Sequence, residues 1–243
     1  MGNAVRTSTR QGSRVGSALS GLAVALGCVL FLGGFVWGAV LYQPYTVPTD
    51  SMDPTVKAGD RVLAERTDGS EVRRGDVVVF QDSVWGSVPM VKRVVGIGGD
   101  KVGCCGEQGR LTVNGKPVAE PYLKDKGPNS QPTFKTTPVP KGKLFLLGDH
   151  RIDSADSRVH LQDSSNGAVP RSAVQARVDA IAWPMSGFGT VERPAAFAAM
   201  PGGVSEPGPV RALWYAIVGG AVLILVGAAY GPIARRAGRG RRA

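Results

Sequence analysis

Two long apolar runs and a central stretch of short alternating segments divide the chain into three parts. Residues 15–42 and 212–234 are mostly apolar and contain no charged side chain. A helix of about 20 apolar residues is long enough to cross the hydrocarbon core of a bilayer. Buried helices of soluble proteins seldom run this long without a charge. The pattern therefore predicts two transmembrane helices, at residues 17–42 and 212–234.

Between the apolar runs, short β-branched segments alternate with Gly, Pro and Asp, which is typical of strands separated by turns. Asn114-Gly115 is a good hairpin signal between two such segments. This middle part is predicted to be mainly β, a β-sheet domain between two transmembrane helices, and it is large enough for a core of its own. The expected strands are Arg61–Ala64, Asp76–Phe80, Val91–Ile97, Arg110–Val113 and Lys143–Leu147.

Three further segments have less regular patterns. Pro128–Pro140 is rich in Pro and Thr and predicts a loop or a loose hairpin, whereas Ser172–Ile181 could form a short helix or a strand. Ala195–Pro209 has the Pro, Gly and Ala content of a tether. The expected order is an N-tail, a helix, the β domain, a tether, a second helix and a C-tail, at residues 1–16, 17–42, 43–193, 194–211, 212–234 and 235–243.

The formal net charge of +10 is concentrated at the two ends of the chain. Residues 1–42 carry three arginines and residues 211–243 carry six, and neither part contains an acid. Residues 43–210 carry the other 20 Lys and Arg and all 19 Asp and Glu, so the middle is nearly neutral. A nucleic-acid-binding domain should instead have a basic face. Nucleic acid is therefore not an expected partner.

The arginines beside the apolar runs predict an orientation in the membrane. Basic residues that flank membrane helices stay in the cytoplasm. Arg6, Arg10 and Arg14 precede the first helix, and the cluster Arg235–Arg242 follows the second. Both termini are thus expected in the cytoplasm, with the β domain outside the plasma membrane. The first helix is longer than the apolar core of a cleaved signal peptide, which favours an uncleaved anchor.

The cysteines and histidines do not indicate a metal site. Cys28 lies within the first apolar run, whereas Cys104 and Cys105 are adjacent and lie outside it. The adjacent pair could form a disulfide, pair between chains or stay free, and an oxidising compartment favours the disulfide. His150 and His160 lack further ligands at metal-binding spacing. Neither a metal nor another cofactor is expected.

Three polar segments stand beside apolar strands, at residues 48–55, 90–96 and 148–158. Together they resemble the motifs of the type I signal peptidases, which are Ser-Lys endopeptidases. A lone lysine among valines, such as Lys92, usually lies on a solvated face of a strand. The resemblance therefore rests on the motifs taken together, in this order and spacing. The resemblance extends from about Tyr45 to Pro184, plus the anchor. The matching motifs are Ser51-Met52-x-Pro54-Thr55, Arg74-Gly75-Asp76-Val77-Val78, Lys92-Arg93-Val94 and Gly148-Asp149-x-Arg151-x-x-Ser154-x-Asp156-Ser157-Arg158.

The residue types in these motifs suit nucleophilic catalysis. A serine hydroxyl is a poor nucleophile until a base takes its proton. A lysine can be that base only when it is neutral, and burial among apolar groups lowers its pKa. The valines beside Lys92 would supply that environment. Ser51 is therefore the predicted nucleophile and Lys92 its general base, and no histidine is required.

The resemblance implies roles for the other motif residues. Thr49 would offer its hydroxyl to the oxyanion beside the Ser51 backbone N–H, and Ser154 would hydrogen-bond the Lys92 amine and orient it. Four charged residues would form an ionic scaffold, and four apolar residues would line small subsites. The scaffold residues are Arg93, Asp149, Asp156 and Arg158, and the subsite residues are Val47, Met52, Val56 and Val91.

The resemblance implies an enzyme that removes N-terminal signal peptides from exported preproteins after small residues, at Ala-x-Ala sites. Its partners would be those signal peptides, the lipid bilayer and a nearby secretion translocon. An extended chain of nine residues keeps Ser51 within about 30 Å of the membrane after Tyr42. His150 departs from the Asn that the family commonly has, and Asp50 follows the Gram-positive pattern.

The second apolar helix is not general in the family and leaves the topology open. Two other functions also stay open. The first is a related Ser-Lys peptidase dedicated to another exported substrate. The second is a non-catalytic binding protein anchored in the membrane on the same scaffold.

Overall fold

The computed structural model describes residues 8–127 and 130–240, and the chain divides into two compact units. The helical unit is formed by the two ends of the chain, up to Leu41 and from Pro209 onward. The β domain comprises residues 42–208. Three of the arginines used to predict the orientation lie outside the described residues, as do the side chains of the other arginines in the two tails.

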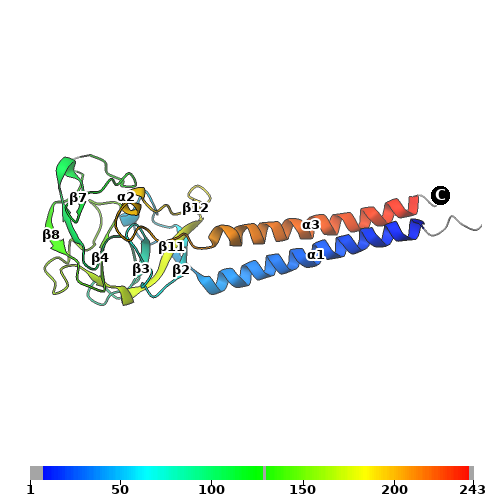
Figure 1. Ribbon diagram of the computed structural model, residues 1–243, viewed down its shortest axis with the longest axis horizontal. Coiled ribbons are helices and arrows are strands. Elements are labelled where there is room, and N and C mark those ends of the chain that lie inside the picture. Colours follow the sequence, from blue (N-terminus) through cyan, green and yellow to red (C-terminus); the bar gives the residue numbers. More distant parts are fainter. Residues whose placement is uncertain (1–7, 128–129, 241–243) are drawn as a thin grey trace, which may run out of the picture. The chain divides into compact units, whose positions relative to one another are not determined.

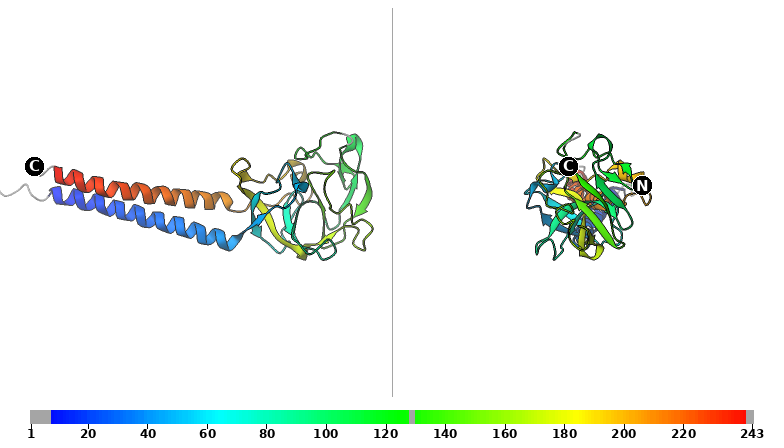
Figure 2. Two further views of the ribbon diagram at one scale, coloured as in Figure 1. Left: turned by 180° about the vertical axis from the view of Figure 1, so that it is seen from behind. Right: turned by 90° about the vertical axis from the view of Figure 1, so that its left-hand side faces the viewer.

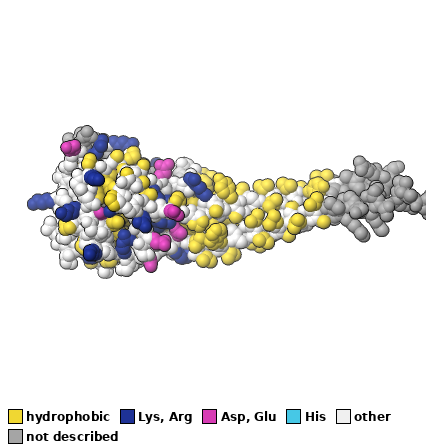
Figure 3. Space-filling model, viewed as in Figure 1, with side chains coloured by type: hydrophobic (Ala, Val, Ile, Leu, Met, Phe, Trp, Pro, Cys, Tyr) yellow, Lys and Arg dark blue, Asp and Glu magenta, His cyan; other side chains and the backbone are white. Residues whose placement is uncertain are grey.

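The helical unit contains two long helices, α1 (Ser8–Leu41) and α3 (Val210–Gly240). The parts that are long and apolar enough to cross a membrane are Gly16–Leu41, with 26 residues, and Val210–Ile233, with 24. Large apolar side chains point outward along both helices (Figure 3). A helix that exposes this much apolar surface suits a lipid environment better than water.

The helices α1 and α3 lie side by side (Figures 1 and 2), and glycines allow the closest approach. A Cβ atom on Gly27 would lie 2.8 Å from the Gly220 carbonyl oxygen, and one on Gly220 would lie 2.6 Å from the Phe31 nitrogen. Ser20 Oγ also donates a hydrogen bond to the Gly227 carbonyl, at 2.7 Å. Small residues and interhelical hydrogen bonds of this kind hold membrane helices together.

The larger sheet of the β domain has eight strands in the order β1-β2-β11-β3-β4-β9-β10, with β12 paired to β11. Neighbouring strands are antiparallel. This confirms the predicted mainly β fold. The strands are β1 (Tyr42–Thr46), β2 (Arg61–Arg66), β3 (Val77–Phe80), β4 (Met90–Ile97), β9 (Lys143–Leu147), β10 (Val169–Pro170), β11 (Val174–Trp183) and β12 (Gly189–Thr190).

A smaller sheet has the strand order β7-β6-β5-β8. Its strands β6 and β7 are joined at Asn114-Gly115, where both residues have positive φ angles, 54° and 76°, as the predicted hairpin turn requires. The bounds are β5 (Lys101–Cys104), β6 (Thr112–Val113), β7 (Lys116–Pro117) and β8 (Phe134–Pro138). The short helices are η1 (Asp50–Met52), η2 (Glu107–Gly109), η3 (Arg171–Ala173) and α2 (Ala195–Ala198).

The two ambiguous segments of the sequence both contribute strands. Ser172–Ile181 falls mostly in β11, which pairs with both β2 and β3 and therefore lies inside the larger sheet. Pro128–Pro140 contains β8, which pairs with β5 and does not form a hairpin of its own. Because these strands find their partners far away in the sequence, the local pattern did not decide their structure.

The predicted tether, residues 194–211, differs from the observed structure. Phe197 in α2 is fully buried in a core cluster of the β domain. Arg74 Nη1 donates a hydrogen bond to the Pro201 carbonyl, at 2.7 Å. One buried aromatic side chain thus fixes a segment of otherwise small residues, and the β domain ends at Gly208 and not at residue 193.

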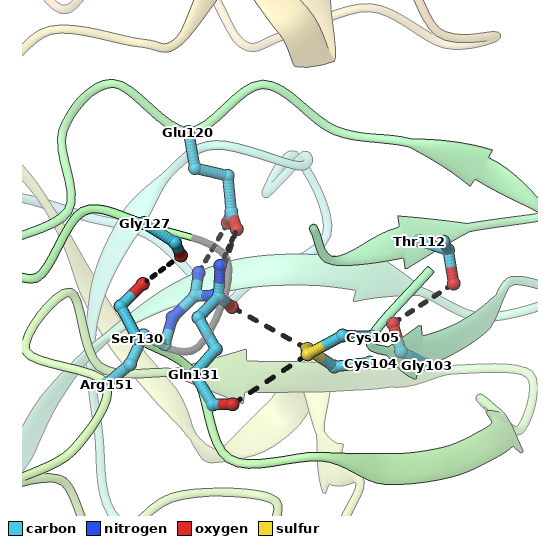
Figure 4. Close-up of a disulfide and its surroundings, with 9 residues drawn as sticks. All are labelled: Gly103, Cys104, Cys105, Thr112, Glu120, Gly127, Ser130, Gln131 and Arg151. Atoms are coloured by element: carbon cyan, nitrogen blue, oxygen red, sulfur yellow. Dashed lines mark hydrogen bonds and ion pairs between the residues drawn. A yellow bond between two sulfur atoms is a disulfide. The ribbon is translucent and has the colours of Figure 1, made fainter. Parts of the chain in front are cut away.

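Cys104 and Cys105 form a disulfide with each other, which is the first of the three predicted alternatives. The pair lies at the end of β5 (Figure 4). The Cys105 sulfur is 3.8 Å from the Gln131 backbone oxygen, and the Cys104 sulfur is 4.0 Å from the Gln131 side-chain oxygen. The disulfide therefore packs against residue 131.

Candidate active site

Ser51 lies in η1, on the loop between β1 and β2, and is 9% exposed. Its backbone carbonyl accepts a hydrogen bond from the His150 backbone N–H, at 3.1 Å. The Asp50 carboxylate accepts one from the Ala58 N–H, at 3.0 Å. The Thr49 hydroxyl is 3.2 Å from Ser51 Oγ. These contacts fix the loop and bring two hydroxyls together at its tip.

Lys92 lies in β4, with β3 on one side and β9 on the other. Its side chain is buried, and its Nζ is 2.7 Å from Ser51 Oγ. Burial lowers the pKa of Lys92 to about 8, and the nearby carboxylates of Asp156 and Asp149 oppose this shift. The lysine is therefore not on a solvated face, and its neutral form is accessible near neutral pH.

Arg93, the next residue in β4, forms a two-pronged ion pair with Asp149. Its Nε and Nη2 lie 2.9 and 2.7 Å from the two carboxylate oxygens, and both side chains are almost fully buried. The Thr55 hydroxyl also donates to this carboxylate, at 2.5 Å. Asp149 thus connects the loop after Ser51 to the strand that carries Lys92.

Asp156 and Arg158 form the second ion pair of the predicted scaffold. Arg158 Nε and Nη2 are 2.8 and 2.7 Å from the Asp156 carboxylate. Asp156 also accepts the Gly148 N–H, at 3.0 Å, and Arg158 donates to the Arg151 carbonyl, at 2.7 Å. The pair closes the loop of residues 148–158 on itself.

Ser154 does not make the hydrogen bond to Lys92 that the resemblance implied. Its Oγ is buried and has no hydrogen-bond partner among the described residues. Gly148 separates it from the Ser51 loop, because a Cβ atom on Gly148 would clash with both the Ser154 hydroxyl and the Ser51 carbonyl. The hydroxyl therefore lies near the Ser51 backbone, and in this structure it does not hydrogen-bond the Lys92 amine.

The four residues predicted to line small subsites belong to one apolar cluster of the larger sheet. Their exposed fractions lie between 0 and 7%, so they form a packed floor. Ser51 and Lys92 are sequence neighbours of two members of this cluster. The four residues are Val47, Met52, Val56 and Val91.

A family model described as signal peptidase, peptidase S26, matches residues 19–183 of this chain. The chain belongs to the signal peptidase family. It is 32% identical over 206 residues to a probable signal peptidase I from Mycobacterium leprae (strain TN), covering 61% of this chain and 71% of that one. It is 36% identical over 182 residues to signal peptidase IB from Staphylococcus aureus (strain Mu50), covering 66% and 87%.

A solved signal peptidase I from Enterococcus faecalis V583 aligns at 28% identity and a TM-score of 0.36, over 43% of this chain and 94% of that chain. The family match confirms the resemblance read from the motifs and makes this chain a serine peptidase, with two apolar helices that fit membrane anchoring. The matched region ends at Trp183, so α3 lies outside it.

Several side chains that contact the segments around Ser51 and Lys92 were not predicted from the sequence of this signal peptidase. Arg151 and Thr55 stood inside recognised motifs but received no role. The others lie in a short charged segment after β7, which has neither a strand nor a helix pattern in the sequence. They are Glu120, Tyr122, Lys124 and Asp125.

Proposed function

We propose that this enzyme removes signal peptides from exported preproteins, with Ser51 as nucleophile and Lys92 as general base. One observation carries the proposal. Lys92 Nζ lies 2.7 Å from Ser51 Oγ, and both side chains are buried. That distance allows direct proton transfer. Burial lowers the pKa of Lys92 to about 8, which supplies the neutral amine that a base requires.

The reaction follows from these positions. Neutral Lys92 takes the Ser51 hydroxyl proton while Oγ attacks the carbonyl carbon of the scissile bond. The Thr49 hydroxyl and the Ser51 N–H donate hydrogen bonds to the oxyanion that develops. Protonated Lys92 then gives its proton to the departing amine, which leaves an acyl-enzyme. Lys92, neutral again, activates a water molecule that releases the signal peptide.

The apolar floor beside the pair supports cleavage after small residues. Val47, Met52, Val56 and Val91 pack tightly around the segments that carry Ser51 and Lys92. Side chains packed this closely leave little depth for a substrate residue, which favours alanine-sized side chains and fits Ala-x-Ala sites. The substrate segment would bind in extended form along a free strand edge.

The sequence and the two apolar helices support a proposed position in the membrane. Both termini face the cytoplasm because the arginine-rich tails flank the helices on that side. The β domain then lies outside the plasma membrane, where exported preproteins emerge beside the secretion translocon. A vicinal disulfide, Cys104–Cys105, suits this more oxidising side.

The test is in vitro processing of a preprotein with an Ala-x-Ala site by Ser51→Ala and Lys92→Ala. We expect each variant to lose at least about 10³-fold in kcat, as loss of a nucleophile or its base does. Lys101→Ala, which removes an exposed lysine from β5, is the matched control and should process at the wild-type rate. Processing by either catalytic variant at the wild-type rate would reject the mechanism. If the wild type itself did not process the preprotein, a non-catalytic binding protein would be favoured.

A further inference from the structure

Residues Glu120–Asp125 follow β7 and approach the segments that carry the nucleophile, the base and the ionic scaffold. Val118 and Leu123 are buried and anchor the segment in the β domain. The polar and aromatic side chains of Glu120–Asp125 contact the segments around Ser51, Lys92 and Asp149. None of these contacts belongs to the strand pairing of the smaller sheet.

The first contact is an ion pair between Glu120 and Arg151, visible in Figure 4. Both side chains are almost fully buried, with 3% and 1% exposed. Arg151 Nε also donates to the Gly148 carbonyl, at 2.9 Å. Glu120 therefore holds the beginning of the loop of residues 148–158.

The second contact joins the segment to the strand that carries the base. The guanidinium of Arg93 lies 4.2 Å from the centre of the Tyr122 ring, a cation–π geometry. The Tyr122 hydroxyl donates to Glu120, at 2.6 Å, so the two side chains support each other. Because Arg93 follows Lys92 in β4, this contact fixes the backbone beside the base.

The third and fourth contacts involve the residues nearest to the nucleophile. Lys124 forms an ion pair with Asp53, two residues after Ser51. The Lys124 backbone N–H also donates to the Asp149 carbonyl, at 3.3 Å. The Asp125 carboxylate lies 3.6 Å from His150 Nε2, and the His150 backbone N–H holds the Ser51 carbonyl.

We propose that Glu120–Asp125 is a clasp that positions Ser51 against Lys92. The inference rests on the proposed function, because it assigns a role in the Ser-Lys reaction. Lys92 sits on a strand inside the sheet, whereas Ser51 sits on a loop, so their distance depends on what holds that loop. The clasp joins the loop to β4 and to residues 148–158. A displacement of about 1 Å at a reacting group lowers the rate by up to about 10²-fold.

Lys124 is the clasp residue best suited to a test. Its side chain is 42% exposed and that of Asp53 is 14% exposed. An ion pair this open to solvent contributes little to stability, so its loss should loosen the Ser51 loop without unfolding the protein. Glu120 is unsuited, because its removal would leave the charge of Arg151 buried and unpaired.

The experiment compares Lys124→Met with Lys126→Met in the full-length enzyme in detergent micelles. Lys126 is the matched control, an exposed lysine two residues further along the same segment. With a preprotein substrate, Lys124→Met should lower kcat about tenfold, with KM and Tm unchanged. Lys126→Met should match the wild type, and Lys124→Arg should restore most of the lost kcat because it keeps the positive charge.

Asp53→Asn provides the second test of the same contact. It should reproduce the loss seen in Lys124→Met, and the double variant should lose no more than either single variant. Equal kcat for Lys124→Met and Lys126→Met would overturn the clasp, and so would additive losses. A loss of kcat that is matched by a fall in Tm in both single variants would also overturn it, because the segment would then be only structural.

The same assay separates this inference from the proposed function. If Ser51→Ala keeps its activity, the Ser-Lys mechanism fails. If Ser51→Ala is inactive while Lys124→Met behaves like the wild type, the mechanism stands and only the clasp is rejected.

Discussion

Lys92 is almost fully buried, although a lysine side chain normally carries a positive charge that burial disfavours. Desolvation disfavours its ammonium form, whereas Asp149 and Asp156 favour it. Both carboxylates are held by arginines, Asp149 by Arg93 and Asp156 by Arg158. Desolvation is the largest effect, and the positive charge of Arg158 adds to it, so the pKa of Lys92 falls to about 8.

This lowered pKa predicts the pH dependence of cleavage. A base must be neutral, so activity is lost as the pH falls below the pKa of Lys92 and Nζ gains a proton. We expect kcat/KM to be half-maximal near pH 8, to fall about tenfold per pH unit below it and to level off above it. Initial rates between pH 6 and 10 would measure this. Circular dichroism over the same range would check that the protein stays folded. A flat profile between pH 6 and 8 would contradict the assigned base.

At the scale of single residues, the sequence identified what lies in short motifs and missed what depends on distant contacts. Ser51 and Lys92 each stood in a recognisable motif, and the structure brings them together. Glu120 and Arg151 are 31 residues apart in the sequence, and Asp53 and Lys124 are 71 apart, so a local sequence pattern does not predict these clasp contacts. The hydrogen bond implied for Ser154 is not made, because hydroxyl orientation depends on packing that a motif does not encode.

At the scale of secondary structure, segments with a run of apolar, β-branched residues were predicted well, and segments without such a run were not. Both long helices and the strands β2, β3, β4 and β9 agree with the apolar pattern. The edge strand β1 was missed because it is short, follows α1 directly and contains Pro44, a residue that suits an edge. The strand β5 was missed because its four residues, two of them small, show no clear alternation.

The pairing of α1 with α3 gives a prediction at this scale. Gly27 and Gly33 lie on the same helix, but a Cβ atom on Gly27 would clash with the backbone of α3, whereas one on Gly33 meets nothing within 4 Å. Gly27→Ala should therefore weaken the pairing several-fold, and Gly33→Ala should not. Energy transfer between labelled α1 and α3 peptides in micelles would measure this. Equal pairing by the two variants would show that the glycine contact does not hold the helices together.

At the scale of the whole molecule, the two ends of the β domain lie together. The Tyr42 hydroxyl donates to one Asp179 oxygen, at 2.9 Å, and Arg193 donates to the other, at 2.8 Å. A Cβ atom on Gly208 would clash with the side chains of both Asp179 and Tyr42, so Gly208 packs directly against them. The first and last residues of the domain thus close around one carboxylate on β11.

This closure predicts that residues 42–208 fold without the two helices. A fragment of these residues keeps the contacts that Tyr42, Arg193 and Gly208 make with Asp179. It also keeps the buried Phe197 and the Ser205 hydroxyl near Asp76. A fragment of residues 42–193 keeps all the strands but loses Phe197. We expect it to be less stable by about 3–5 kcal/mol, the usual effect of removing a buried aromatic side chain.

Urea denaturation of the two fragments would measure that difference, and cleavage of a soluble Ala-x-Ala peptide would check the site. The longer fragment should unfold in one cooperative transition and cleave the peptide, because Ser51, Lys92 and the clasp all lie within it. Equal stability of the two fragments would mean that residues 194–208 are a tether after all. A longer fragment that is folded but inactive would mean that the membrane helices contribute to catalysis itself.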